Sequence, residues 1–488
     1  MNKIKYWLFF IVAIGIITPL QAQLCLPKVL CDHMVLQQGK PVAIWGTATP
    51  ESDVEVSFLK QRKHTVADES GSWCLYLDPM KASATPEKLR VRSGKEQLLI
   101  RDVLVGEVWL ASGQSNMEYS MNNHPKYAKP CRGDRNYQQK AYERANNPSI
   151  RLLHVQKRID TDTLPSHGWQ QLSQESLKPI SAVAYFFAEM LADSLQVPVG
   201  IISSSWGGTP IEAWTPTEAY LNTPPFSDEM VRGRIYQGID VGKRYRKLIA
   251  PLIPYTLRGF LWYQGEQNLI QGDMAVYAEK QRCLIESWRQ KWNDKTLSFY
   301  YVQLAPYMYS QRRNDAMAKT WETLPEFRQV QALTMEQVTH TGMVVTTDLC
   351  DSPRDIHPPY KWEVGRRLAR WALANDYGFR NLIYKNPSVE RMHAEGDTVW
   401  ITFRDCGEGL MTADGRHPDW FWVAGKDGRY FEAKAELVAS NCVAIRCERV
   451  RHPMSVRFGW DEVAAPNLRN SAGLPAIPFK KRINETIE

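Results

Sequence analysis

The chain has 488 residues, of which 44% are hydrophobic and 23% charged, and its formal net charge is +7 at pH 7. Composition of this kind is typical of a globular protein with roughly two to four domains, and it excludes a largely disordered chain. The positive charge is spread thinly and forms no dense Lys/Arg tract, so we do not expect nucleic-acid binding.

The first residues have the pattern of a secretory signal. Lys3 and Lys5 precede an apolar run from Tyr6 to Thr18. This run is shorter than the roughly 20 residues of a membrane-spanning helix. Ala22 supplies a small residue before a cleavage point at Gln23. We therefore predict a signal peptide over residues 1–22 and a periplasmic or secreted protein. No later segment is apolar enough to predict a membrane span.

The nine cysteines are an odd number, so at least one is expected to stay free or to pair between chains. No C-x-x-C pair occurs, which disfavours a zinc site of that kind, and we predict no metal. Buried free thiols are the expectation for most of the cysteines. A lipid anchor at Cys25 is disfavoured, because Gln23 and Leu24 stand where small residues are required.

Residues 23–105 predict a small β-sandwich. Short apolar or alternating runs occur at Met34–Leu36, Val42–Trp45 and Val54–Phe58. Turn residues such as Thr49-Pro50 and Ser70-Gly71 separate them, a spacing typical of sandwiches.

Residues 106–378 predict an α/β domain, because strand patterns now alternate with helical ones. A three-layer domain with a mainly parallel sheet fits this order. The expected strands and helices are Val108–Ala111, Ile180–Gln196, Val199–Ser203, Arg258–Tyr263, Phe299–Leu304, Phe327–Gln337, Met343–Thr347 and Lys361–Ala374.

Residues 379–488 return to β patterning. Strands are expected at Thr398–Phe403, Trp420–Val423 and Val443–Arg446, with glycine-rich turns between them. A second β-sandwich-like region is the natural interpretation.

Ser115 is the first candidate for chemistry. It follows the strand Val108–Ala111, at the edge where open α/β sheets bind ligands. Met117 stands where the nucleophile elbow G-x-S-x-G would have its second glycine, so the ordinary α/β-hydrolase motif is absent. A serine of this kind alone is more often a turn residue. A reachable base would make it a nucleophile.

His357 is the candidate base, and Asp355 the candidate acid beside it. The two lie two residues apart, so on an extended backbone their side chains leave the same face. A carboxylate beside an imidazole can fix its tautomer and stabilise the imidazolium. Asp351 is the alternative acid, since a loop can fold a more distant carboxylate onto the ring.

Two further segments follow predicted strands. Gly207 and Gly208 let the backbone approach a ligand and point N–H groups at a developing oxyanion. Gln264 can donate its amide N–H to the same oxygen, a contribution of about 2.7–4 kcal/mol to the barrier. Glu266, on the same turn, is expected to support neighbouring loops.

These segments together resemble the sialate O-acetylesterase family of SGNH-type (GDSL-like) hydrolases. The resemblance is carried by Gly113-Gln-Ser-Asn-Met117, Trp206-Gly-Gly-Thr-Pro-Ile-Glu-Ala-Trp214, Trp262-Tyr-Gln-Gly-Glu266 and Asp355-Ile-His-Pro358, and it continues at Asp32-His-Met-Val-Leu-Gln-Gln38 and Gly473-Leu-Pro-Ala-Ile-Pro-Phe479. It thus extends over nearly the whole mature chain.

The resemblance implies an SGNH-type catalytic domain and removal of O-acetyl groups from sugars, sialic acid above all. Ser115 carries over as nucleophile and His357 as base. Gly207 or Gly208, Gln264 and the Ser115 N–H carry over as the oxyanion site. Many SGNH hydrolases have their acid three residues before the histidine, where this chain has an arginine.

The partner is thus expected to be an O-acetylated sugar, with no cofactor, and the oligomeric state stays open. The main alternative substrate is acetylated xylan or another plant glycan. Arg354 is a candidate for a sialic acid carboxylate. Tyr119, His124 and Tyr127, in the inserted loop 118–150, are candidates for contacts with the sugar. A non-catalytic carbohydrate-binding protein is the rival from another class.

Overall fold

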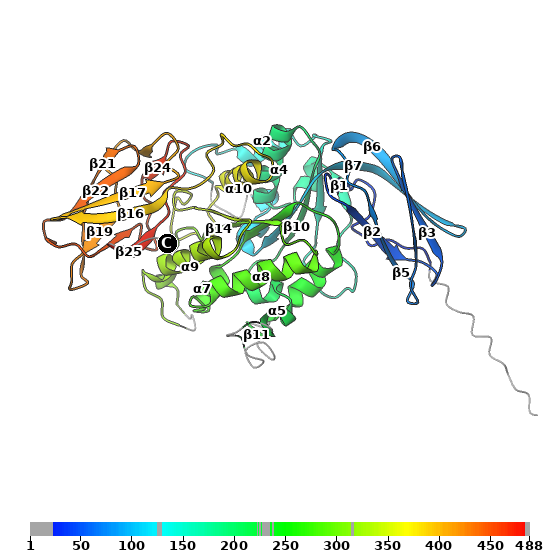
Figure 1. The fold of residues 1–488 in the computed structure, drawn as a ribbon, viewed down its shortest axis with the longest axis horizontal. Helices are drawn as coiled ribbons and strands as arrows, with labels where there is room; N and C mark the ends of the chain where they lie inside the picture. The colour runs from blue at the N-terminus through cyan, green and yellow to red at the C-terminus, as the bar shows by residue number, and fades with distance from the viewer. Residues whose placement is uncertain are drawn as a thin grey trace, which may run out of the picture.

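The computed structural model describes residues 23–123, 129–221, 223, 226, 235, 236, 239–313 and 317–483. The predicted signal peptide and the candidates His124 and Tyr127 lie outside these residues. Within them the chain forms a mixed α/β protein with β-sheet regions at both ends (Figure 1).

A mainly parallel sheet organises the middle of the molecule. Its strand order is β15-β14-β13-β7-β10-β8-β9, and every neighbouring pair is parallel except β8 with β9. The strands are β7 (Glu96–Gly113), β8 (Ile150–His154), β9 (Trp169–Gln171), β10 (Val199–Ser205), β13 (Gly259–Tyr263), β14 (Ser298–Val302) and β15 (Thr341–Val344). The strands β10, β13 and β14 are buried along their whole length, and so is the second part of β7, as expected of parallel strands covered on both faces.

Long helices pack on this sheet. The helices α4 (Ala182–Leu195) and α10 (Lys361–Asn375) contact each other, and Figure 1 shows them on the opposite side of the sheet from α8 (Tyr277–Lys291) and α9 (Thr323–Gln337). The apolar stripe predicted from Ile180 becomes α4, which begins where the Ser181 hydroxyl accepts the Ala184 N–H.

One helix was not predicted, and the observed bounds of several predicted elements differ from the expected ones. The helix α8 was not predicted, because the buried polar Lys280 interrupts its apolar stripe. The helix α9 begins four residues earlier than expected, since its Pro325 lies in the first turn, where no N–H is needed. The strand β15 ends at Val344, because the Val345 carbonyl accepts from Arg367 instead of a strand.

The N-terminal β region is built onto the same strand that leads to Ser115. The 18-residue β7 pairs with β6 and β1 along its first part and with β10 and β13 along its second. The predicted boundary between residues 105 and 106 falls inside this strand. The other strands of this region are β1 (Val35–Gln37), β2 (Val42–Thr47), β3 (Asp53–Phe58), β4 (Gln61–Val66), β5 (Ser72–Leu77) and β6 (Ser83–Ser93). One hydrophobic core runs through both regions.

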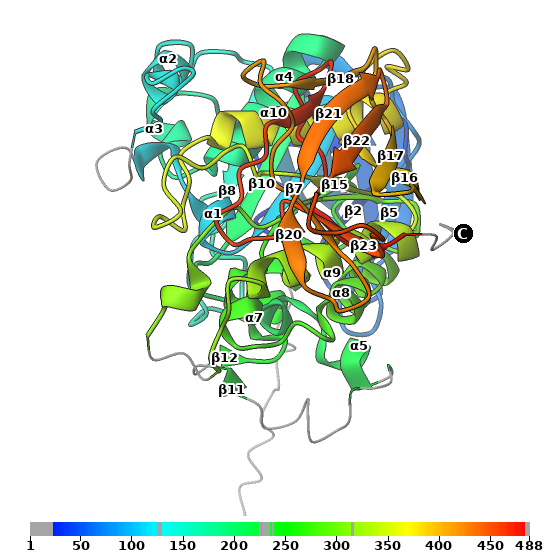
Figure 2. The same ribbon diagram turned by 90° about the vertical axis from the view of Figure 1, so that its left-hand side faces the viewer.

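The C-terminal region has a separate hydrophobic core between two four-stranded antiparallel sheets. Figure 2 shows these sheets in front of the α/β region. The first contains β16 (Ser388–Glu395), β17 (Thr398–Arg404), β21 (Lys434–Ala439) and β22 (Cys442–Arg446). The second contains β19 (Phe421–Ala424), β20 (Tyr430–Glu432), β23 (Ser455–Phe458) and β25 (Phe479–Arg482), and β18 (Leu410–Thr412) pairs with β24 (Leu468–Asn470).

Short elements make up most of the connections. They are α1 (Ser115–Glu118), η1 (Met121–Asn123), α2 (Tyr137–Glu143), α3 (Gln174–Leu177), η2 (Ile211–Trp214), α5 (Thr217–Leu221), β11 (Ile235–Tyr236), β12 (Ile239–Asp240), η3 (Tyr245–Ile249), η4 (Ala250–Leu252), α7 (Glu266–Ile270) and η5 (Tyr309–Gln311).

All nine cysteines are free thiols. Only Cys283, Cys406 and Cys447 are buried, so burial is less general among them than expected. No helix in the described part of the chain has the length and apolar character needed to cross a membrane.

Candidate active site

Ser115 lies where β7 ends and the short helix α1 begins. Gly113, the last strand residue, has φ +140°, and a Cβ there would lie 2.2 Å from the Tyr263 carbonyl oxygen. The Gln114 N–H donates to that same carbonyl at 3.0 Å. The turn therefore requires glycine, because the ends of β7 and β13 approach too closely for a side chain. This close approach fixes the position of Ser115.

A cavity of about 330 Å³ brings Ser115 and His357 together. Both side chains are half-buried. The cavity is lined by Gln114, Ser115, Glu118, Tyr119, Gly207, Gly208, Glu266, Gln267, Ile270, Ile356 and His357. The two predicted catalytic residues, far apart in the sequence, thus line one cavity.

The two acid candidates are held by different parts of the His357 loop. The Asp355 carboxylate accepts the backbone N–H of His357 at 2.8 Å, which tightens the turn before the imidazole. Asp351 accepts the Tyr360 hydroxyl at 2.5 Å and the Cys131 N–H at 2.8 Å. Asp351 therefore ties the His357 loop to a second loop, and the choice of acid stays a prediction. Arg354 is exposed at the surface.

The two glycines of the second segment differ in their surroundings. A Cβ on Gly207 would lie 3.2 Å from the Ser115 Cβ, so this glycine packs against Ser115. Its N–H, however, donates to the Glu118 carboxylate. Gly208 has φ +69° and open space where a Cβ would be. Its N–H donates to no group among the residues that the structure describes.

Gln264 lies beneath the cavity, fully buried. Its amide nitrogen donates to the Gln114 side chain at 3.1 Å, to the Thr209 carbonyl at 3.2 Å and to the Asn268 side chain at 2.7 Å. These contacts support the loops that carry Ser115 and the two glycines. A direct oxyanion role for Gln264 stays a prediction.

Five residues of the cavity wall were missed by sequence reasoning as functional candidates: Gln114, Glu118, Gln267, Ile270 and Ile356. Glu118 accepts from Lys157 at 2.5 Å besides the Gly207 N–H. Gln267 is buried, and its amide nitrogen has no partner among the described residues. Ile356 precedes His357. Glu118 could have been suspected from its place in the Ser115 segment, three residues after the nucleophile, but its partners come from distant loops.

Glu266 lines the cavity and holds the neighbouring Asn116 side chain, in line with the supporting role expected for it. Its carboxylate accepts the Asn116 amide at 2.5 Å, and burial raises the pKa of this carboxyl above its usual value. Tyr119 also lines the cavity but is almost fully buried, with Lys361 over its ring at 5.0 Å.

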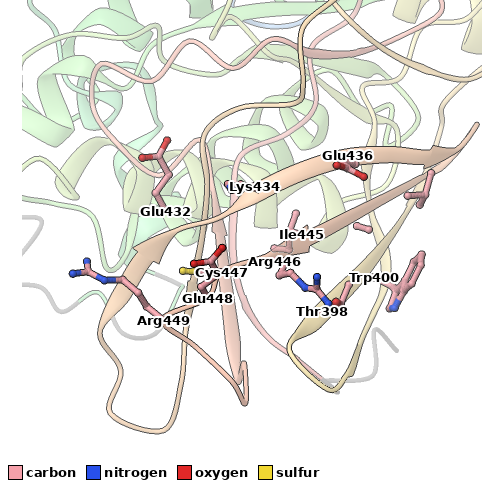
Figure 3. A pocket seen from close by; sticks show the side chains of 12 residues that line it. Thr398, Trp400, Glu432, Lys434, Glu436, Ile445, Arg446, Cys447, Glu448 and Arg449 are labelled. Carbon is pink, nitrogen blue, oxygen red and sulfur yellow. The ribbon is translucent and has the colours of Figure 1, made fainter.

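Another hollow, of about 650 Å³, lies on the outer face of the C-terminal sheet (Figure 3). Trp400 and Thr398 from β17 and the charged side chains of Lys434, Glu436 and Arg446 line it. Its lining, all within the described residues, contains no histidine. It therefore has no nucleophile and base of the kind that Ser115 and His357 provide. No group of three or more potential metal ligands occurs in the described ranges.

Comparisons with known proteins identify the family. Residues 105–374 match the family described as carbohydrate esterase, sialic acid-specific acetylesterase. The chain is 31% identical to the sialate O-acetylesterase of Homo sapiens, over 92% of this chain and 90% of that protein. It is 28% identical to the sialate O-acetylesterase of Pongo abelii over the same shares.

A solved structure gives the same result for the fold. A carbohydrate acetylesterase from Xanthomonas citri aligns with a TM-score of 0.82 and 32% identity, and the alignment includes 94% of this chain and 99% of that one. The chain therefore belongs to the carbohydrate esterase, sialic acid-specific acetylesterase family and is a carbohydrate esterase.

Proposed function

We propose that this esterase hydrolyses O-acetyl esters of sialic acids through an acetyl-enzyme formed on Ser115. The observation that carries the proposal is the shared cavity of Ser115 and His357. The relatives named sialate O-acetylesterases support sialic acid as the sugar. We also assign the catalytic domain the three-layer SGNH-type architecture, which the parallel sheet and its covering helices support.

In the first step His357 takes the Ser115 hydroxyl proton while the oxygen attacks the acetyl carbonyl carbon. The carbonyl oxygen becomes negative and needs N–H donors. The Gly208 N–H donates to none of the described residues, and the Ser115 N–H, at the start of α1, has no intrahelical partner. The bond between the acetyl carbon and the sugar oxygen then breaks, and His357 returns the proton to the leaving sugar hydroxyl.

In the second step water attacks the acetyl group on Ser115. His357 takes a proton from the water and delivers it to the serine oxygen as the acyl bond breaks, which releases acetate. The chemistry requires no metal or organic cofactor. Asp355 is our choice for the acid that supports His357, because it lies within the same turn, whereas Asp351 is held by Tyr360 and Cys131.

Hydrolysis of a nitrophenyl acetate ester tests the chemistry. The Ser115→Ala variant should lose about 10³-fold or more of the wild-type kcat, because the residual rate then comes from binding and oxyanion donors alone. Equal rates for the two proteins would refute the proposal. Asp355→Asn and Asp351→Asn, measured in parallel, identify the acid as the position with the larger loss.

A neutral acetylated glycan, such as acetylated xylan, is the second candidate substrate, and Glu118 favours it. This carboxylate lines the cavity beside Ser115. Two like charges 4 Å apart repel by about 4 kcal/mol at an effective dielectric of about 20, so the carboxylate of a sialic acid is disfavoured beside Glu118. Lys157, 2.5 Å from Glu118, offsets part of this repulsion.

Acetate release from O-acetylated sialic acids and from acetylated xylo-oligosaccharides separates the two substrates. The proposal expects the higher kcat/KM for sialic acids. The opposite preference would refute the assignment of sialic acid as the substrate but would not affect the proposed mechanism.

We also propose export by the N-terminal signal, on the basis of its sequence pattern. Sequencing of the mature protein from a periplasmic or secreted fraction should find Gln23 at the N-terminus. An uncleaved Met1 terminus in the cytoplasm would contradict export.

A further inference from the structure

A buried polar cluster joins the two catalytic loops beneath the cavity. Its members are Asn116, Glu266 and Lys361, and all three side chains are buried. The Asn116 amide nitrogen donates to the Glu266 carboxylate at 2.5 Å and to the Ile356 carbonyl at 3.0 Å. The Asn116 amide oxygen accepts from the Lys361 ammonium at 2.6 Å.

The contacts of Asn116 connect the neighbours of the two proposed catalytic residues. Asn116 is covalently next to Ser115, and Ile356 is covalently next to His357. A single side-chain amide therefore spans the gap between the loop of the nucleophile and the loop of the base. Asn116 itself has no part in the proposed acyl transfer.

Lys361 fixes which way the amide faces. The Lys361 Nζ donates a hydrogen bond to the Asn116 side chain, and only the amide oxygen can accept it. The amide nitrogen must then face the Ile356 carbonyl and Glu266. Lys361 is itself close to the base in sequence, at the first residue of α10. Its Nζ lies over the rings of Tyr119 and Tyr263, at 5.0 and 5.3 Å from their centroids.

We propose that the Asn116–Glu266–Lys361 cluster is a positioning device that holds the Ser115 hydroxyl and the His357 imidazole in the geometry needed for proton transfer. The inference rests on the proposed function, because it presupposes that Ser115 and His357 act together. Displacements of about 1 Å between reacting groups cost about 10²-fold in rate, so a link of this kind controls kcat even though it does not touch the substrate.

Asn116→Asp tests the link most directly. Aspartate keeps the shape of the side chain and an oxygen for Lys361, but it has no N–H for Ile356 or Glu266. We expect kcat for nitrophenyl acetate to fall about 10²-fold while KM changes little. The rate at which a fluorophosphonate probe labels Ser115 should fall in parallel, because labelling also needs the serine and histidine aligned.

Glu107→Gln is the matched control. Glu107 is a buried carboxylate in a polar network with Gln37, Arg258 and Tyr377. It lies on β7 beside the first residue of β10, whereas Ser115 follows the end of β7. The Glu107→Gln variant should have a lower melting temperature than the wild type, but its kcat at a temperature where it is folded should stay close to the wild-type value. The inference is overturned if Asn116→Asp keeps wild-type kcat and labelling, or if its loss matches that of Glu107→Gln in both activity and melting temperature.

A second pair of variants keeps the test decisive if Asn116→Asp does not fold. Glu266→Gln retains an oxygen that can accept from Asn116, whereas Glu266→Ala does not. We expect the glutamine variant to keep most of the wild-type kcat and the alanine variant to lose at least about tenfold more. Equal losses in the two would overturn the inference.

The Ser115→Ala assay separates this inference from the proposed function. An active Ser115→Ala variant would refute both. An inactive Ser115→Ala variant together with a fully active Asn116→Asp variant would refute only the positioning role.

Discussion

The Glu118 carboxylate accepts the Gly207 N–H, and it lines the same cavity as Ser115 and His357. A developing oxyanion cannot share that N–H with Glu118, because two negative groups would compete for one donor. Either Gly208 serves as the glycine donor or Glu118 moves when substrate binds. In both cases we expect the charge of Glu118 to influence which sugars the cavity accepts.

Neutralising Glu118 should therefore change substrate preference. In Glu118→Gln we expect KM for an O-acetylated sialic acid to fall by about tenfold, equivalent to about 1.4 kcal/mol of relieved repulsion, and KM for an acetylated xylo-oligosaccharide to change little. Steady-state kinetics on both substrates measure the difference.

Glu175→Gln is the control for this change. Glu175 pairs with Lys178 at 2.5 Å, the same distance as the pair of Glu118 with Lys157, but it lies outside the cavity and is exposed. Equal effects of Glu118→Gln on both substrates would show that the carboxylate does not select between them.

The residues that could be predicted are those whose role is local. Ser115 follows a strand, and Asp355 and His357 are close in sequence, so pattern and spacing were enough to nominate them. The wall residue Glu118 and the link to Lys361 could not be predicted in the same way. Their partners, Lys157 and Asn116, come from distant parts of the chain and are brought close only by folding.

At the scale of elements, the site depends on how closely β7 and β13 approach each other. Gly113 leaves no room for a Cβ, since the Tyr263 carbonyl oxygen would lie 2.2 Å from it. Gly113→Ala should therefore push the two strands apart and lower the free energy of unfolding by about 3 kcal/mol or more. Urea denaturation measures this change.

Gly94→Ala is the control that measures the cost of a positive φ without a steric contact at the Cβ. Gly94 also has positive φ, at +55°, but nothing lies within 4 Å of its Cβ position. We expect a cost of about 1–2 kcal/mol there, from the left-handed conformation alone. Equal costs at the two glycines would contradict the steric argument.

Elements with clear periodicity were predicted well, and those with buried polar residues were not. The helix α4 and the strand β10 carry continuous apolar patterns, and they form where expected. The helix α8 was missed, because Lys280 turns inward to the Glu212 carboxylate, 2.5 Å away. A charged side chain that is buried with a partner interrupts the apolar stripe by which the inward face of a helix is recognised in the sequence.

At the scale of the molecule, the N-terminal and catalytic regions share one core, whereas the C-terminal region has its own. The C-terminal region meets the catalytic domain through polar contacts such as Arg457 with Glu322, at 2.7 Å, and the Ser310 N–H with Glu462, at 2.9 Å. The shared core could not be predicted from the sequence. Around residue 105 the pattern changes from strands alone to strands that alternate with helices, which indicates a domain boundary, whereas the strand β7 continues through this position.

The stability of the molecule should depend on pH through Lys361. Burial lowers the pKa of its ammonium from 10.5 to about 7, although Glu266, Asp355 and the Cys350 thiol nearby act in the opposite direction. Between these two pKa values the unfolded chain binds a proton that the folded protein does not bind. The free energy of unfolding should therefore rise with pH from about 7 towards 10.5.

Lys361→Met isolates this contribution. Between pH 7 and pH 9 we expect the free energy of unfolding of the wild type to increase by on the order of 2 kcal/mol relative to the variant. Urea denaturation at the two pH values measures the difference. Parallel pH dependence in the two proteins would show that Lys361 keeps its proton when folded.

The central claim is that an acetyl group passes through Ser115, and mass spectrometry of rapidly quenched enzyme tests it most directly. With an O-acetylated substrate in excess, we predict one added acetyl group on the peptide that contains Ser115, and none in Ser115→Ala. An acetyl group on another residue, or turnover by Ser115→Ala at the wild-type rate, would contradict the account.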